Sequence, residues 1–146
     1  MWRFLRAFKP VHCKVEDFCR GRARQPDNEF LADCGIEAGG EAARVALAVR
    51  RAVAWIGVVD PLFVRASDSY PGTLELLPLW DSMDWLSLQL RIEEELGQKV
   101  RWEACECAPN PEPLTVGEMV ACVRELLVQT PDAEQVAAAD RPRDTR

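Results

Sequence analysis

Ser82 is the side chain in this sequence whose position could support covalent chemistry. It follows Asp81 and precedes a stretch with helical spacing, so the Asp81 carboxylate can cap that helix by accepting hydrogen bonds from first-turn N–H groups. A hydroxyl in this turn faces solvent, and a phosphate attached to it would lie at the positive end of the helix dipole. The sequence therefore favours a phosphate on Ser82. The alternative is that Ser82 is only a first-turn residue beside a capping aspartate.

No other set of residues suggests catalysis. The single histidine, His12, lies in a basic N-terminal stretch, and no Gly-x-Ser-x-Gly elbow surrounds Ser82. The sequence also lacks a phosphate-binding loop and a dinucleotide-binding motif. We therefore expect a protein that is not itself an enzyme.

Six cysteines raise the question of metal or redox chemistry. There is no Cys-x-x-Cys pair, and the one Cys-x-Cys pair would need two further ligands from distant segments. The N-terminus lacks the features of a secretory signal, so we expect free thiols in a reducing cytoplasm and no metal. A cysteine-based metal or redox protein remains an alternative, and it would use the pair Cys105 and Cys107 together with Cys13, Cys19 and Cys34.

Three stretches have the apolar spacing of amphipathic helices, whereas no strand signal is comparably strong. The first should end at Gly57 and the second at Gly97. The third opens with a capping-box spacing, in which the Thr115 hydroxyl and the Glu118 carboxylate satisfy each other's exposed N–H groups. We predict an all-α fold with helices at residues 41–57, 82–96 and 115–128.

The long connection between the first two predicted helices, residues 60–81, mixes turn-forming residues with apolar ones. We expect it to pack down onto the helices rather than to project from them. The apolar side chains expected to anchor it are Leu62, Phe63, Leu74, Leu76, Leu77 and Leu79.

The chain has 146 residues, enough for one core, and a net charge of −6 that is unevenly spread. Residues 1–25 carry seven basic and two acidic side chains, which leaves a net charge of −11 on residues 26–146. An acidic body repels nucleic acid and anionic lipid and favours a basic partner surface, and no uncharged run is long enough to cross a bilayer. The predicted organisation is a basic and aromatic extension (1–40), a helical domain (41–128) and a disordered tail (129–146).

Three motifs follow one another at informative distances: Asp81-Ser82-Met83-Asp84-Trp85-Leu86, Ile92-Glu93-Glu94-Glu95-Leu96-Gly97 and Thr115-Val116-Gly117-Glu118. Their order resembles that of acyl carrier proteins over residues 41–128. The resemblance implies a bundle of three main helices plus a short variable third segment, with a long loop between the first and second helices. It also implies that Ser82, beside Asp81, carries 4′-phosphopantetheine, which a phosphopantetheinyl transferase attaches from coenzyme A.

The function implied by this resemblance is delivery. A cytoplasmic, monomeric carrier would hold acyl or aminoacyl groups as thioesters on the arm. It would present them to acyl ligases or synthase-type enzymes of fatty acid or secondary metabolite biosynthesis. The different function that we weigh against it is an unmodified carrier-fold adaptor, which binds partner proteins through its second helix.

The sequence also departs from the family pattern. Where the family commonly has Asp-Leu-Gly-x before the Asp-Ser pair, this chain has Leu77-Pro78-Leu79-Trp80, without the glycine and with a large aromatic beside Ser82. Ser87 stands where a glutamate is common, and Arg91 replaces a small residue. The partner enzymes can therefore differ from those of fatty acid synthesis.

The second predicted helix has two apolar stripes. One, made of Trp85, Leu88, Ile92 and Leu96, is expected to pack on the other helices. The other begins beside Ser82, and the resemblance implies that it docks enzymes with basic surfaces. For Met83 and Leu86 the alternative is a core position beneath the connection, and for the acidic residues it is a merely solvated face. The expected docking residues are Met83, Asp84, Leu86, Leu90, Glu93 and Glu94.

Overall fold

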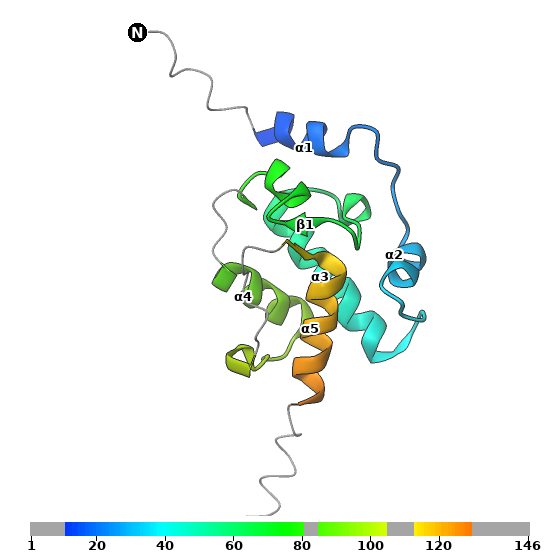
Figure 1. The fold of residues 1–146 in the computed structure, drawn as a ribbon, viewed down its shortest axis with the longest axis vertical. Helices are drawn as coiled ribbons and strands as arrows, with labels where there is room; N and C mark the ends of the chain where they lie inside the picture. Colours follow the sequence, from blue (N-terminus) through cyan, green and yellow to red (C-terminus); the bar gives the residue numbers. More distant parts are fainter. Residues whose placement is uncertain (1–10, 81–84, 105–112, 130–146) are drawn as a thin grey trace, which may run out of the picture.

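The computed structural model describes residues 11–80, 85–104 and 113–129 (Figure 1). These residues are mostly helical, which confirms the predicted all-α class, and their one sheet has two strands of two residues each. In this part of the chain no helix is long and apolar enough to cross a membrane. The elements are α1 (Val11–Cys19), α2 (Asp27–Asp33), α3 (Gly40–Gly57), η1 (Pro61–Phe63), β1 (Ser69–Tyr70), η2 (Thr73–Leu76), α4 (Trp85–Leu96), η4 (Trp102–Ala104), β2 (Leu114–Thr115) and α5 (Val116–Val128).

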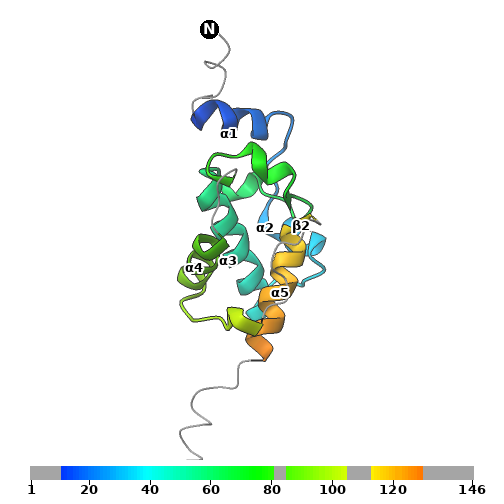
Figure 2. The same cartoon turned by 60° about the vertical axis from the view of Figure 1, so that its left-hand side comes forward.

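Helix α3 is the centre of the core and packs against both α4 and α5 (Figures 1 and 2). Its valines and alanines supply the buried side, and Val45, Val49 and Val53 are at most 1% exposed. The helix ends at Gly57, as predicted. A Cβ atom at Gly57 would lie 2.6 Å from Cδ1 of Leu77, so the close approach of the connection requires a glycine here.

The N-terminal part of the chain contributes to the same core. Helix α2 packs against α3, and α1 packs against η2. The segment that contains them was expected to be an extension, and its described residues 14–36 are packed onto the helical domain. Their buried apolar side chains are Phe18, Phe30, Leu31 and Ile36.

A buried arginine of α3 fastens this N-terminal segment to the helices. The Arg50 side chain is 1% exposed and donates a hydrogen bond to Oδ1 of Asp27 at 2.8 Å. It also donates to the carbonyl oxygens of Gln25 at 2.8 Å and Val64 at 3.1 Å, and its guanidinium lies over the Phe30 ring. Because its partners come from the N-terminal segment around α2 and from the connection, Arg50 joins α2, α3 and the connection at one point.

A second ion pair joins the N-terminal segment to the connection between α3 and α4. Arg22 donates two hydrogen bonds to the carboxylate of Asp68, each 2.9 Å long, and its guanidinium lies over the Phe18 ring. Asp68 is 2% exposed and also accepts a hydrogen bond from the backbone N–H of Arg65. The carboxylate is thus paired and hydrogen-bonded, which is what burial of a charge requires.

The connection between α3 and α4 packs onto the helices, although only some of its apolar side chains are buried. Leu74 and Leu77 have no exposed surface, whereas Leu76 and Leu79, expected to be anchors, are 56% and 57% exposed. Strand β1 lies within the connection and pairs antiparallel with β2. Strands of two residues are too short to leave an alternating pattern in the sequence, so periodicity does not predict them.

Helix α5 begins as its sequence predicts. Thr115 is the N-cap residue: its Oγ1 accepts from the N–H of Glu118 at 3.1 Å, and its own N–H donates to Oε2 of Glu118 at 2.7 Å. This reciprocal pair is the expected capping box, and it satisfies two N–H groups that the helix cannot. The predicted tail lies outside the described residues from position 130 onward.

Candidate functional site

The predicted attachment site lies outside the described residues, but both of its flanks lie within them. The described part of the connection ends at Trp80, and α4 begins at Trp85. The structure therefore shows the anchor before the site and the helix after it. The expected site residues in the gap are Asp81, Ser82, Met83 and Asp84.

Trp80 anchors the chain immediately before the predicted site. Its side chain is fully buried, and its indole Nε1 donates a hydrogen bond to the carbonyl oxygen of Val53 at 3.2 Å. Its ring also packs against the ring of Tyr70, with 5.4 Å between the ring centroids. A buried, hydrogen-bonded tryptophan fixes the point where the chain leaves the core. The large aromatic that departs from the family pattern is thus a core residue here.

Leu79 has a backbone conformation that glycine adopts more easily than leucine. Its φ angle is +66°, in the left-handed region, while its side chain is 57% exposed. In the Asp-Leu-Gly-x pattern of acyl carrier proteins, the third position is the glycine, and Leu79 occupies it. The backbone at Leu79 thus has a conformation that suits glycine, the residue of the family pattern at this position.

Helix α4 separates its apolar residues onto two faces. Leu88, Ile92 and Leu96 are 2%, 2% and 5% exposed and pack in the core, as predicted. Leu86 and Leu90 are 55% and 47% exposed. Leu86 therefore lies at the surface, and its alternative placement beneath the connection is wrong.

Glu93 was expected on the exposed docking surface, but the structure buries it. It is 9% exposed, and its carboxylate accepts hydrogen bonds from Nζ of Lys99 at 2.7 Å, the backbone N–H of Val100 at 3.0 Å and the indole Nε1 of Trp102 at 3.1 Å. Burial raises the pKa of the Glu93 carboxyl, but these hydrogen bonds outweigh burial and hold the pKa below its ordinary value. The carboxylate of Glu93 is thus bound by donors of the same chain.

Glu94 is the acidic residue of this run that does face solvent. It pairs with Arg91 at 3.0 Å, and Arg91 also donates to Glu95. The Arg91 guanidinium lies 4.6 Å from the centroid of the Trp55 ring, and Trp55 itself is 60% exposed. The outer face of α4 therefore continues onto α3 through Arg91 and Trp55, a continuation that the analysis of one helix at a time missed.

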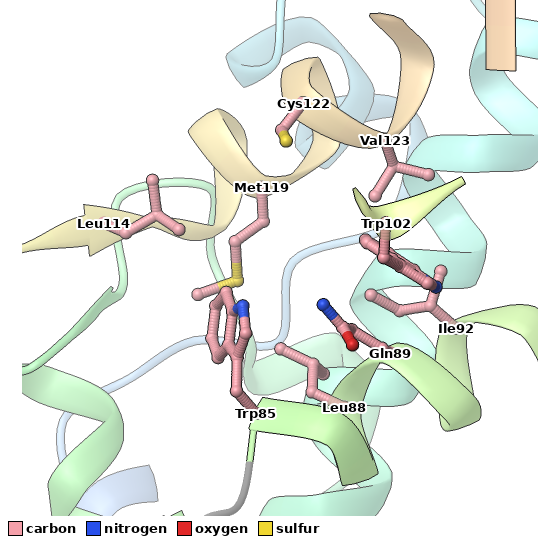
Figure 3. Close-up of a pocket in the computed structure, with 9 residues that line it drawn as sticks. All are labelled: Trp85, Leu88, Gln89, Ile92, Trp102, Leu114, Met119, Cys122 and Val123. Atoms are coloured by element: carbon pink, nitrogen blue, oxygen red, sulfur yellow. The ribbon is translucent and has the colours of Figure 1, made fainter. Parts of the chain in front are cut away.

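An apolar pocket lies between α4, η4, β2 and the first turns of α5 (Figure 3). Trp85 lies beside Met119 on one side of the pocket, and Trp102 lies beside Ile92 on another. The void holds about 20 Å³, which is room for about one water molecule. The residues that line it are Trp85, Leu88, Gln89, Ile92, Trp102, Leu114, Met119, Cys122 and Val123.

Three of the cysteines have described side chains, and none of these three forms a disulfide: Cys19, Cys34 and Cys122. Burial raises the pKa of both Cys19 and Cys34, which favours the protonated thiol over the thiolate. Among the described residues no three His, Cys, Asp or Glu side chains gather as metal ligands would. The side chains of Cys13, Cys105, Cys107 and His12 lie outside the described part.

Comparisons of the chain with protein-family models, with curated proteins and with solved structures found no match.

Proposed function

We propose that this chain is an acyl carrier protein whose Ser82 carries 4′-phosphopantetheine and which delivers acyl or aminoacyl groups, held as thioesters, to partner enzymes. The observation that carries the proposal is the division of α4, the helix that follows Asp81-Ser82. It buries Leu88 and Ile92 and presents Leu86 and Leu90 to solvent, so the helix that follows the predicted attachment residue in the sequence has an exposed apolar face.

The approach to Ser82 supports the same proposal. Trp80 is fixed to α3, and Leu79 keeps the left-handed conformation that suits the family's glycine. The left-handed backbone therefore occurs at the position where the family pattern has its glycine, although the residues differ. The proposed phosphodiester on Ser82 would be stabilised by the N–H groups of the helix start.

The chemistry in this proposal belongs to the arm. Phosphopantetheine supplies a thiol at the end of a flexible chain, and the protein supplies attachment, orientation and recognition. No residue of the chain has a catalytic role in the proposal, so the chain is not itself an enzyme.

Partner enzymes would dock on the outer face of α4. Leu86 and Leu90 provide apolar contact, and Glu94 provides an exposed negative charge for a basic surface. Met83 and Asp84 would extend this face toward Ser82. Glu93 takes no part in it, because its carboxylate is bound within the molecule.

The apolar pocket beside α4 is where the resemblance would place a sheltered acyl chain. A void of about 20 Å³ is nearly filled, so a chain longer than a carbon or two enters only if a lining side chain moves. Candidate side chains are Trp85, Trp102 and Met119.

The adaptor function is favoured by the same exposed face, because Leu86 and Leu90 can bind a partner whether or not Ser82 is modified. The two functions differ in whether the protein takes up an acyl group. Purified protein is incubated with acetyl-coenzyme A, radiolabelled in its acetyl group, and a broad-specificity phosphopantetheinyl transferase. A carrier acquires the label on Ser82 and releases it to neutral hydroxylamine, which cleaves thioesters. An adaptor acquires none, and its Leu90→Ala variant loses its partner.

A further inference from the structure

Three hydrogen-bond donors from one short segment converge on a single buried carboxylate. Lys99, Val100 and Trp102 all donate to Glu93, and they all belong to the chain that follows α4. The chain reverses at Gly97, where φ is +69°, and returns along the helix to reach Glu93. We call this arrangement the Glu93 clasp.

The clasp holds one wall of the apolar pocket. Trp102 donates its indole N–H to Glu93, while its ring faces the void beside Ile92 (Figure 3). Val100, the middle residue of the segment, is 6% exposed, so its N–H has no ready access to water. The position of the Trp102 ring therefore depends on a polar contact made on the side away from the pocket.

A carboxylate is suited to this role. Its two oxygens offer enough acceptor sites for all three donors, and hydrogen bonds to a charged acceptor are stronger than those to a neutral one. An amide in its place would accept through one oxygen only and would turn an N–H₂ group toward the Lys99 ammonium. Buried donors left without an acceptor favour a local opening that gives them water.

We propose that Glu93 is a positioning residue that holds Trp102 against the pocket, so that release of the Glu93 clasp opens the pocket to an uncharged apolar ligand. The proposed function enters only in the identity of the natural ligand, which would be the acyl group on the arm. The clasp itself is a property of the unmodified chain.

The test compares two neighbouring substitutions with the same change of charge. Glu93→Gln weakens the clasp, whereas Glu94→Gln alters an exposed glutamate on the same helix. The unmodified proteins are titrated with N-phenyl-1-naphthylamine, an uncharged apolar fluorophore. Since the apparent dissociation constant falls as the open fraction rises, Glu93→Gln should bind about fivefold more tightly than the native chain and Glu94→Gln equally to it.

A second readout follows the clasp directly. Hydrogen exchange of the Trp102 indole N–H, assigned by NMR with Trp102→Phe, should accelerate in Glu93→Gln and stay unchanged in Glu94→Gln. If Glu93→Gln does not fold, Lys99→Met removes one donor from a side chain that is 85% exposed. It should shift binding and exchange in the same direction by a smaller amount.

Equal affinities for Glu93→Gln and Glu94→Gln would overturn the proposal. So would tighter binding in both, because charge rather than the clasp would then control the pocket. No transferase or coenzyme A is present in these experiments, so their failure would leave the carrier function standing. A chain that is never modified on Ser82 could in turn still show the clasp.

Discussion

Leu79 is one of two non-glycine residues with a positive φ in the described part of the chain, and the other is Val58, which follows the last residue of α3. A left-handed conformation costs an ordinary side chain about 1–2 kcal/mol, and the exposed leucine regains little of this by burial. Glycine removes the steric cost but gains freedom in the unfolded chain. The resemblance to acyl carrier proteins and the backbone thus indicate the same residue for this position.

The substitution Leu79→Gly should therefore raise the free energy of unfolding by about 0.5–1 kcal/mol, as measured by urea denaturation. Leu76→Gly is the matched control, because Leu76 is equally exposed but lies in the 3-10 turn η2 without a positive φ. It should lower the free energy of unfolding by a similar amount. A loss of stability in both variants would show that the backbone at Leu79 is not strained.

The burial of two charged residues, Glu93 and Arg50, could not be predicted from the sequence. Position 93 lies at the border of the buried stripe of α4, and its burial depends on a segment that folds back from position 99 onward. The burial of Arg50 likewise depends on distant segments, since its hydrogen-bond partners come from positions 25, 27 and 64. Periodicity describes one helix at a time and carries no information about such returning chains.

At the scale of elements, local signals were sufficient for the predictions that were confirmed. Gly57 ends α3, the capping box of Thr115 starts α5, and Leu88 and Ile92 are buried in α4. Each depends on residues within a few turns of one another. The predicted start of this helix at Ser82 remains a prediction, because residues 81–84 lie outside the described part of the chain.

Two leucines of α4 separate the packing role of this helix from its docking role. Leu88→Ala should cost about 2–5 kcal/mol of unfolding free energy as a core truncation, whereas Leu90→Ala should cost less than about 0.5 kcal/mol. The effects on the rate of modification by the transferase should be in the opposite order. Leu90→Ala should slow the modification, whereas Leu88→Ala, while it remains folded, should leave the rate nearly unchanged. Transferase kinetics unaffected by Leu90→Ala would mean that docking uses another face.

At the scale of the whole molecule, the N-terminal segment packs as a layer on the helical domain, whereas its composition predicted a separate extension. Its basic charge suggested a separate extension, but two of those charges are ion-pair partners of the body rather than a free surface. Arg22 bonds to Asp68, and Arg24 bonds to Asp60. Charge composition describes net attraction and does not show which charges are already paired.

Loss of the buried pair should therefore matter more than loss of an exposed one. Asp68→Asn leaves Arg22 without a charged partner next to a 2% exposed site and should cost about 2–4 kcal/mol of unfolding free energy. Arg24→Gln, which disrupts an exposed pair with Asp60, should cost less than about 0.5 kcal/mol. Thermal or urea denaturation of both variants checks this, and equal costs would contradict a structural role for the N-terminal layer.

The measurement that tests the carrier function most directly is the intact mass of the protein after reaction with coenzyme A and a broad-specificity phosphopantetheinyl transferase. The native chain should gain a single phosphopantetheine, which peptide mapping should locate on Ser82. Ser87→Ala, which removes a nearby exposed hydroxyl, should gain it as well, and Ser82→Ala should not. A folded native chain that gains no mass, or an adduct that persists in Ser82→Ala, would contradict the proposed function.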